Sequence, residues 1–217
     1  MSIHGIQKKK LAVLDARYQA LATEKAPLLR LINEAELPEG VYNSNAIENS
    51  TLTLDETEMI LFEQEIMRAV SVREVFEARN LGRVMEYIWN HGHEKVLQNE
   101  LICFVHQMLL ANINDEIAGR FRQGSEYVRV GRYIAPAPDQ IEGLLNQALT
   151  RYQQSEGHYL ETVARFHLDF ATIHPFVDGN GRIGRVLINL QLQQLGVPPV
   201  IIRDAEKYTY YQSFKSF

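Results

Sequence analysis

The 217-residue sequence has a single cysteine, Cys103. One cysteine excludes an internal disulfide framework and suits a reducing compartment, so we expect a cytoplasmic protein. The neighbours from Leu101 to Val105 are apolar, which predicts a buried and unreactive thiol. The seven histidines include no H-E-x-x-H pattern, and no cysteine stands at a metal-binding spacing, so a zinc site is not expected.

Long apolar runs and excess positive charge are also missing. No segment is long and apolar enough to span a bilayer, and residues 1–22 are amphipathic with three lysines rather than a signal peptide, so no membrane association is expected. The net charge of −5 argues against a nucleic-acid binder, which usually has a basic face. A hydrophobic content of 46% is enough to build the core of a globular protein.

Strand signals are scarce, and helical periodicity dominates. A capping box at Thr53–Glu56 opens one helix, Pro38-Glu39-Gly40 is expected to stop another, and the sequence from Gly196 to Pro199 ends the last. The expected helices are 6–24, 28–35, 53–70, 72–90, 97–113, 138–155, 159–173 and 181–195. The first of these carries an apolar stripe made of Leu11, Leu14, Tyr18 and Leu21.

One segment, Glu126–Ile134, departs from this helical pattern. Its alternation, its β-branched residues and a central glycine predict a strand or hairpin, closed by Pro136 and Pro138. An irregular loop is the alternative. A hairpin on a helical body would suit the capture of an extended peptide by strand addition.

The segment from His174 to Arg185, His-Pro-Phe-Val-Asp-Gly-Asn-Gly-Arg-Ile-Gly-Arg, gathers groups that suit polyphosphate chemistry. His174 can accept a proton near neutral pH, and Pro175 predicts that a helix ends there. Asp178 is a hard oxygen ligand of the kind that Mg²⁺ prefers. The glycines after it predict a turn whose N–H groups face an anion at the start of a helix. Arg182 and Arg185 lie about one turn apart and can reach one phosphate chain.

Two other interpretations compete for this segment. In the first, the segment is purely structural and consists of a helix stop, a glycine turn and two solvated arginines. Gly179, Gly181 and Gly184 also fit the dinucleotide pattern G-x-G-x-x-G, with Asp204 at about the expected distance. That pattern requires a preceding strand, whereas the residues before it form a helical stripe.

The segment resembles the signature of the Fic family, His-Pro-Phe-x-[Asp/Glu]-Gly-Asn-Gly-Arg-x-x-Arg, at every specified position. Flanking matches, including Gly119–Arg122, extend the resemblance from about residue 40 to the end, although Phe217 comes early for the family. The resemblance implies an all-α Fic-fold helical bundle with one small β-hairpin flap. Residues 1–40 would be an N-terminal helical extension and residues 41–217 the Fic domain.

Two further segments take roles from this resemblance. The flap, about residues 126–135, would hold the polypeptide of a target protein beside His174. Tyr210 and Tyr211 would line the adenosine pocket; without the resemblance they would be core or surface aromatics of a terminal helix. The flap edge expected to contact the nucleotide comprises Val130, Gly131, Arg132 and Tyr133.

The sequence Ser-Asn-Ala-Ile-Glu-Asn at residues 44–49 has two interpretations. Asn45-x-x-Glu48 fits an ordinary capping box at a helix start. The segment also resembles the family's inhibitory motif, [Ser/Thr]-x-x-x-Glu-[Gly/Asn], in the N-terminal position of the second inhibitory class. An inhibitory helix at about 43–50 would then present Glu48 to Arg185 as a bidentate ion pair, block the γ-phosphate and misalign the α-phosphate. The residues of this motif are Ser44, Glu48 and Asn49.

The resemblance implies a protein adenylyltransferase that moves AMP from ATP to a Ser, Thr or Tyr hydroxyl of a target protein. His174 would be the base, Asp178 would hold Mg²⁺ against the phosphates, and Arg182 and Arg185 would bind the β- and γ-phosphates. The residues expected to bind ATP through this segment are Asp178, Gly179, Asn180, Gly181, Arg182, Ile183, Gly184 and Arg185.

Three rival activities use the same residues. The first is removal of AMP, with the inhibitory glutamate positioning water. The second is phosphate transfer, as in the related Doc toxins, which carry lysine where this chain has Gly181. The third is nucleotide sensing without turnover, against which His174 argues. The sequence leaves open the target, the modified residue, the direction and the trigger, and its N-terminal helix could serve a homodimer as readily as a core.

Overall fold

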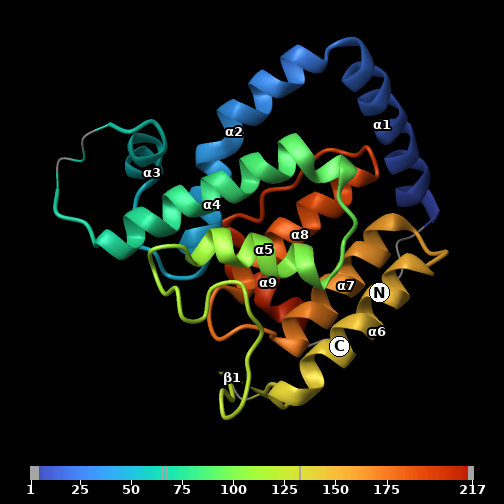
Figure 1. Ribbon diagram of the computed structural model, residues 1–217. Coiled ribbons are helices and arrows are strands. Elements are labelled where there is room, and N and C mark those ends of the chain that lie inside the picture. Colours follow the sequence, from blue (N-terminus) through green and yellow to red (C-terminus); the bar gives the residue numbers. More distant parts are fainter. Residues whose placement is uncertain (1–4, 65, 67, 132, 215–217) are drawn as a thin grey trace.

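The computed structural model describes residues 5–64, 66, 68–131 and 133–214. Within them nine α-helices and one two-stranded sheet are found, which confirms the predicted all-α fold with one hairpin (Figure 1). The helices are α1 Gly5–Glu24, α2 Ala26–Ile47, α3 Leu54–Leu61, α4 Val72–His91, α5 Asn99–Leu110, α6 Ile141–Gln153, α7 Tyr159–Ile173, α8 Asn180–Gln194 and α9 Lys207–Ser213. Short 3₁₀ turns lie at Gly92–Glu94, Pro138–Gln140 and Asp204–Glu206. Among these helices none is long and apolar enough to cross a bilayer.

Helix α8 is the central element of the bundle. It packs on α4 and α7 and also contacts α2 and α5 (Figure 1). Its apolar residues recur at helical spacing, so one face meets matching faces of α4 and α7. The fully buried core side chains at this junction include Leu81, Val84, Val105, Leu109, Phe170, Ile183 and Leu190. The central position of α8 fixes the start of that helix, where the His174–Arg185 segment lies.

Helix α1 stands at the edge of the bundle. It has no buried residue, and Leu14 and Leu21 of the expected apolar stripe are about half exposed. Polar contacts tie it to the start of α7: the Tyr159 hydroxyl donates to Asp15 at 2.9 Å, and Lys8 pairs with Glu161 at 3.3 Å. The stripe therefore does not enter the core of this chain.

The expected stop of the second helix at Pro38 is wrong, because α2 continues through this proline to Ile47. A proline inside a helix costs on the order of 3 kcal/mol, since a hydrogen bond is lost. Leu37, Pro38 and Val41 are buried where α2 packs on α4, and burying each large apolar side chain returns about 1.5–3 kcal/mol. Tertiary packing thus overrides the local helix breaker.

The helix that follows the capping box is shorter than expected. Thr53 and Glu56 form the box as predicted, but α3 ends at Leu61 rather than near residue 70. Glu63 takes a left-handed conformation with φ +57°, and Gln64 donates its N–H to the carbonyl of Met59 at 2.7 Å. This is a Schellman motif, which ends a helix without glycine here. Helix α5 also ends earlier than expected, with left-handed Asn112 just beyond it.

The predicted hairpin is confirmed but is short. Strand β1 is Arg129–Val130 and strand β2 is Tyr133–Ile134, paired antiparallel with Arg129 opposite Ile134. Gly131, at the turn, has φ +59°, the left-handed conformation that a two-residue hairpin turn requires.

Candidate active site

The His174–Arg185 segment forms the end of α7, a tight loop and the start of α8. His174 caps α7 in a left-handed conformation with φ +50°, so the helix ends there as expected. Asn180 closes the loop: its amide accepts from the Phe176 N–H at 2.9 Å and donates to the Phe176 carbonyl at 2.8 Å. Gly179 has φ +81°, and a Cβ there would lie 3.2 Å from Leu109. The side chain of Asn180 therefore shapes the loop.

Arg122 supports this loop through hydrogen bonds to its backbone. The sequence analysis did not identify it as a site residue. It is buried, and its guanidinium donates to four backbone carbonyls. The acceptors are His174 at 2.8 Å, Glu126 at 2.9 Å, Pro136 at 3.0 Å and Ile173 at 3.3 Å. The loop and the base of the flap are thereby joined through one side chain. In the sequence, only the resemblance of Gly119–Arg122 to the family pointed to Arg122. Local spacing could not indicate its role, because the His174 carbonyl that it binds lies 52 residues away.

Replacing Arg122 with methionine should lower the free energy of unfolding by about 3 kcal/mol or more, since it leaves buried carbonyls without a donor. Urea denaturation would measure the loss. The exposed Arg129 on the flap is a matched control, and Arg129→Met should change stability by no more than about 0.5 kcal/mol. Equal stability of the two variants would contradict the structural role of Arg122.

The His174 ring is oriented by the end of α7. Its Nδ1 lies 3.4 Å from the carbonyl oxygen of Ala171. A carbonyl only accepts, so Nδ1 carries the proton and the lone pair of Nε2 is left for a substrate. Burial lowers the pKa of His174 below its usual value. The ring is therefore neutral and ready to accept a proton.

The segment opens onto a cavity of about 470 Å³. Its lining includes His174, Asp178, Gly181 and Arg182 from this segment. Glu48 and Asn49, which follow α2, and Arg73, Glu74 and Glu77 from α4 also line it. The structure thus brings the expected base, the expected metal ligand and the expected inhibitory glutamate to one place.

Arg185 is bound by the residues of the inhibitory motif. Its Nη2 donates to Glu48 Oε1 at 2.9 Å and to the Ser44 carbonyl at 2.8 Å, while its Nε donates to the Ser44 hydroxyl at 2.9 Å. The pair with Glu48 uses one nitrogen and one oxygen, so the expected bidentate geometry is wrong. Ser44 supplies the remaining contacts.

The end of α2 explains the spacing of this motif. Asn49 is left-handed with φ +71°, its N–H donates to Ala46 at 2.8 Å, and the Ser50 N–H donates to Asn45 at 3.1 Å. These bonds form a Schellman motif, in which the left-handed position favours glycine or asparagine. Residues 44–49 therefore end a helix, so the capping-box interpretation of Asn45-x-x-Glu48 is wrong. The inhibitory helix expected at about 43–50 is the end of α2, which stops at Ile47.

The Glu48 carboxylate lies against the first turn of α8. A Cβ built on Gly181 would stand only 2.1 Å from Glu48 Oε1 and 3.2 Å from Arg185 Nη1. The position requires glycine in this state. An anion is thus already bound where the N–H groups and the dipole of α8 favour negative charge.

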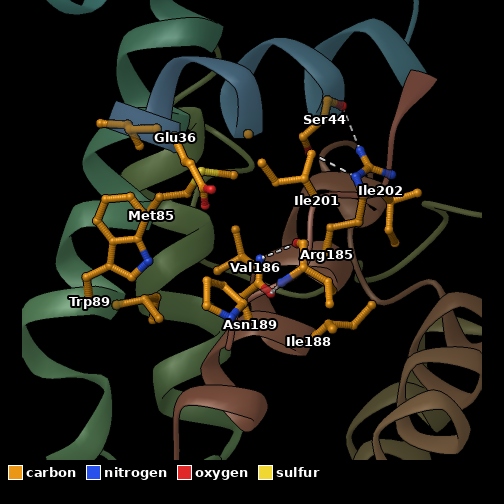
Figure 2. A pocket seen from close by; sticks show the side chains of 15 residues that line it. Glu36, Ser44, Met85, Trp89, Arg185, Val186, Ile188, Asn189, Ile201 and Ile202 are labelled. Carbon is orange, nitrogen blue, oxygen red and sulfur yellow. Dashed lines mark hydrogen bonds between the residues drawn. The ribbon is translucent and has the colours of Figure 1, made fainter. Parts of the chain in front are cut away.

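A largely apolar pocket lies on the other side of this contact (Figure 2). Figure 2 shows Arg185 reaching Ser44 with Ile201 and Ile202 close by. Asn189 holds that segment by accepting from the Val200 N–H at 2.9 Å and donating to the Val200 carbonyl at 3.0 Å. The segment after α8 therefore covers the buried side of the Ser44–Arg185 contact.

Asp178 is held by two arginines. Arg73 Nη2 lies 2.6 Å from Oδ2, Arg182 Nη2 lies 3.4 Å from Oδ1, and the Gly179 N–H donates to Oδ1 at 2.6 Å. Burial alone would raise the pKa of Asp178, but Arg182, Arg73 and this N–H lower it below its usual value. The group is a carboxylate with its side chain 37% exposed. No group of three or more His, Cys, Asp or Glu side chains that could hold a metal ion occurs among the described residues.

Tyr210 and Tyr211 lie side by side, with ring centroids 5.4 Å apart. The Tyr210 hydroxyl bonds to Nε2 of His167 on α7 at 2.7 Å, and His167 packs so closely on Gly184 that a Cβ there would meet Cε1 at 2.9 Å. Burial lowers the pKa of His167 to about 4, so the ring is neutral. This link between α9 and α8 had no counterpart in the sequence analysis.

Several expected site residues do not line the cavity. Ile183 is part of the core, and a Cβ added at Gly184 would meet the ring of His167 rather than the cavity. On the flap, Val130 and Tyr133 form a pair whose side chains are exposed. Arg132 lies outside the described residues.

Comparisons with known proteins agree with the signature. Residues 96–192 match the model of the Fic/DOC family. Two proteins named "Protein adenylyltransferase Fic" are similar. The one from Drosophila melanogaster is 31% identical over 98% of this chain, and the one from Nematostella vectensis is 34% identical over 86%. The chain spans 44% of each relative, so it matches less than half of their length.

The fold has solved counterparts. A Fic family protein from Desulfovibrio desulfuricans superposes with a TM-score of 0.82 at 26% identity, covering all of this chain and 67% of that one. The signature, the family model and the arrangement of helices agree, and the chain belongs to the Fic/DOC family.

Proposed function

We propose that this chain transfers AMP from ATP to a hydroxyl of a target protein and that Glu48 inhibits it at rest. The observation that carries this proposal is the position of the Glu48 carboxylate, paired with Arg185 and set against Gly181 at the start of α8. It occupies an anion site within the cavity that His174 lines. The relatives' names, which specify adenylyl transfer, are consistent with the same reaction.

In the transfer step, Nε2 of His174 takes the proton of the target hydroxyl. The hydroxyl oxygen then bonds to the α-phosphorus of ATP, the bond to the β-phosphate bridging oxygen breaks, and pyrophosphate leaves. Arg182 and Arg185 would hold the β- and γ-phosphates once released from their present partners. Backbone N–H groups from Gly179 to Gly181 would stabilise charge on the transferred group.

Asp178 fits a magnesium ion shared with the phosphates. It is ionised, it lines the cavity, and Mg²⁺ is usually held by one or two carboxylates together with phosphate oxygens. When bound, the ion would offset phosphate charge. Its binding would require Arg73 to give up its 2.6 Å contact with Asp178.

The flap is our proposed docking site for the target polypeptide. Tyr127, Val130 and Ile134 present exposed apolar groups there, and an extended peptide can pair with a free strand edge. We assign Tyr210 and Tyr211 to the adenosine moiety. A homodimer would use the exposed leucines of α1 and the first half of α2, including Leu14, Leu21, Leu28 and Leu31.

A labelling experiment tests the reaction class. ATP labelled on the α-phosphate, and separately on the γ-phosphate, is incubated with Mg²⁺ and the wild type, Glu48→Gly or Glu48→Gly/His174→Ala. Protein-bound α-label that is strong only in Glu48→Gly is expected. Bound γ-label without α-label would identify a kinase instead, and absence of label in every variant would contradict AMP transfer.

Removal of AMP is the second candidate. Glu48 is paired yet 36% exposed, and it lines the same cavity as His174, so it could position a water molecule for attack on a bound AMP group. A target that already carries AMP distinguishes the two reactions. Release of AMP by the wild type, lost in Glu48→Gly, would favour removal.

The pH profile of transfer follows from the state of His174. Because burial lowers its pKa, the neutral base persists below the ordinary histidine value of about 6.5. The acid limb of kcat/KM for Glu48→Gly should therefore have its midpoint below 6.5. Initial rates from pH 5 to 8 would measure it. A midpoint at or above 6.5 would show that His174 is not the titrating base or is not buried in solution.

A further inference from the structure

Four charged side chains beside the phosphate site form a closed ring of alternating sign. Arg73 and Glu77 come from α4, Asp178 from the loop and Arg182 from α8. The contacts are Arg73 Nη2 to Asp178 at 2.6 Å, Asp178 to Arg182 Nη2 at 3.4 Å, Arg182 Nη1 to Glu77 at 3.1 Å and Glu77 to Arg73 Nε at 3.1 Å. Each charge has two neighbours of opposite sign, and the ring is neutral.

Two of the four members are groups that the proposed function assigns to Mg²⁺ and ATP. In the ring, Arg73 lies against Oδ2 of Asp178, while Arg182 and the Gly179 N–H lie against Oδ1, so a metal ion would have to displace one of these donors. The Arg182 side chain is only 4% exposed and is held by Glu77, so a phosphate must displace that glutamate. This ring is separate from the Glu48–Arg185 pair, because the two share no residue.

The ring can open without leaving a charge unpaired. Arg73 and Glu77 are four residues apart on α4 and already contact each other, so they can stay paired as neighbours on one helix face. Asp178 and Arg182 are then free together for the metal ion and a phosphate. If only one of these ligands arrives, the other residue of the two stays paired with Arg73 or Glu77 on α4. Leaving a buried charge without its partner is costly, which favours opening the ring as a whole.

We propose that Arg73 and Glu77 are positioning residues that couple the binding of Mg²⁺ to the binding of the ATP phosphates. The inference rests on the proposed function, since it requires that Asp178 and Arg182 bind these ligands. Breaking the ring should make metal-free ATP easier to bind and should reduce the advantage that Mg²⁺ gives.

The decisive variant is Arg73→Gln/Glu77→Gln, which removes the ring but leaves the net charge unchanged. Either single change would alter ATP affinity through its charge alone. The test uses Glu48→Gly/His174→Ala as the parent, in which ATP is not consumed and Arg185 is free. Calorimetry gives the Kd of ATP in EDTA and in excess Mg²⁺. The ratio of the two values measures the coupling.

In the double variant the Kd of metal-free ATP should fall about threefold to tenfold, the scale of one or two ion pairs, because a phosphate no longer has to displace Glu77 from Arg182; the ratio should fall with it. The matched control is Arg79→Gln/Glu63→Gln, which removes the 2.6 Å ion pair between Arg79 of α4 and Glu63 after α3, outside the cavity, and should change neither value. Unchanged or weaker metal-free binding in the folded double variant would overturn the coupling.

A second variant guards against misfolding. Arg73 is more than half exposed, so Arg73→Gln alone should fold. The lost charge alone would weaken the binding of metal-free ATP more than that of the Mg²⁺ complex, and would therefore raise the ratio of the two Kd values. Loss of the coupling should instead lower this ratio, because Glu77 has no Arg73 to pair with when Mg²⁺ binds Asp178. An unchanged or raised ratio would overturn the inference. If the parent itself binds no ATP, the proposed function fails rather than the ring alone.

Discussion

Replacing Glu48 with glycine should raise AMP transfer about a hundredfold. Arg185 is then free for the γ-phosphate, and the carboxylate leaves the first turn of α8. Misplacement of reacting groups by about 1 Å can cost a hundredfold in rate, and release from a misaligned state should return a similar factor. Incorporation of α-labelled AMP into protein, followed over time, measures the change.

Glu48→Gln separates the two contributions of Glu48 to inhibition, which are its contact with Arg185 and its negative charge. Glutamine keeps a hydrogen-bond acceptor for Arg185 but removes the negative charge that repels the phosphate. Its rate should lie between those of the wild type and Glu48→Gly. Equal rates for the wild type and Glu48→Gly would remove the inhibitory role of Glu48.

Replacing His174 with alanine in the Glu48→Gly protein should lower the rate by about 10²- to 10⁴-fold, the usual contribution of a general base. The affinity for ATP should change little, because the phosphate contacts come from α8 and not from His174. Calorimetry in Mg²⁺ measures the affinity, and α-label incorporation measures the rate.

His93, an exposed histidine in the 3₁₀ turn after α4, is the matched control. His93→Ala should leave both quantities unchanged. A His174→Ala protein that retains full transfer would exclude His174 as the base, and one that no longer binds ATP would indicate a structural role for the ring.

Arg185 shows why local sequence cannot describe the site completely. The signature predicted a phosphate-binding arginine there, and its partner Glu48 was expected from the family motif. The Schellman motif that positions Glu48 could have been predicted from Asn49, because asparagine is common at the left-handed position that follows the end of a helix. The choice between a helix start and a helix end nevertheless depended on α2 continuing through Pro38.

The sequence by itself determined the family signature, the helical class, the hairpin at 129–134 and most helix positions, because periodicity, caps and glycines act over a few neighbours. The tertiary structure decided that α2 passes Pro38, since packing on α4 outweighs one lost hydrogen bond. It also decided that Arg122 supports the loop, that Tyr210 meets His167, and that Arg73 and Glu77 close a ring with Asp178 and Arg182. These contacts join residues far apart in the chain, and only the folding of α4, α7 and α8 together brings them within bonding distance.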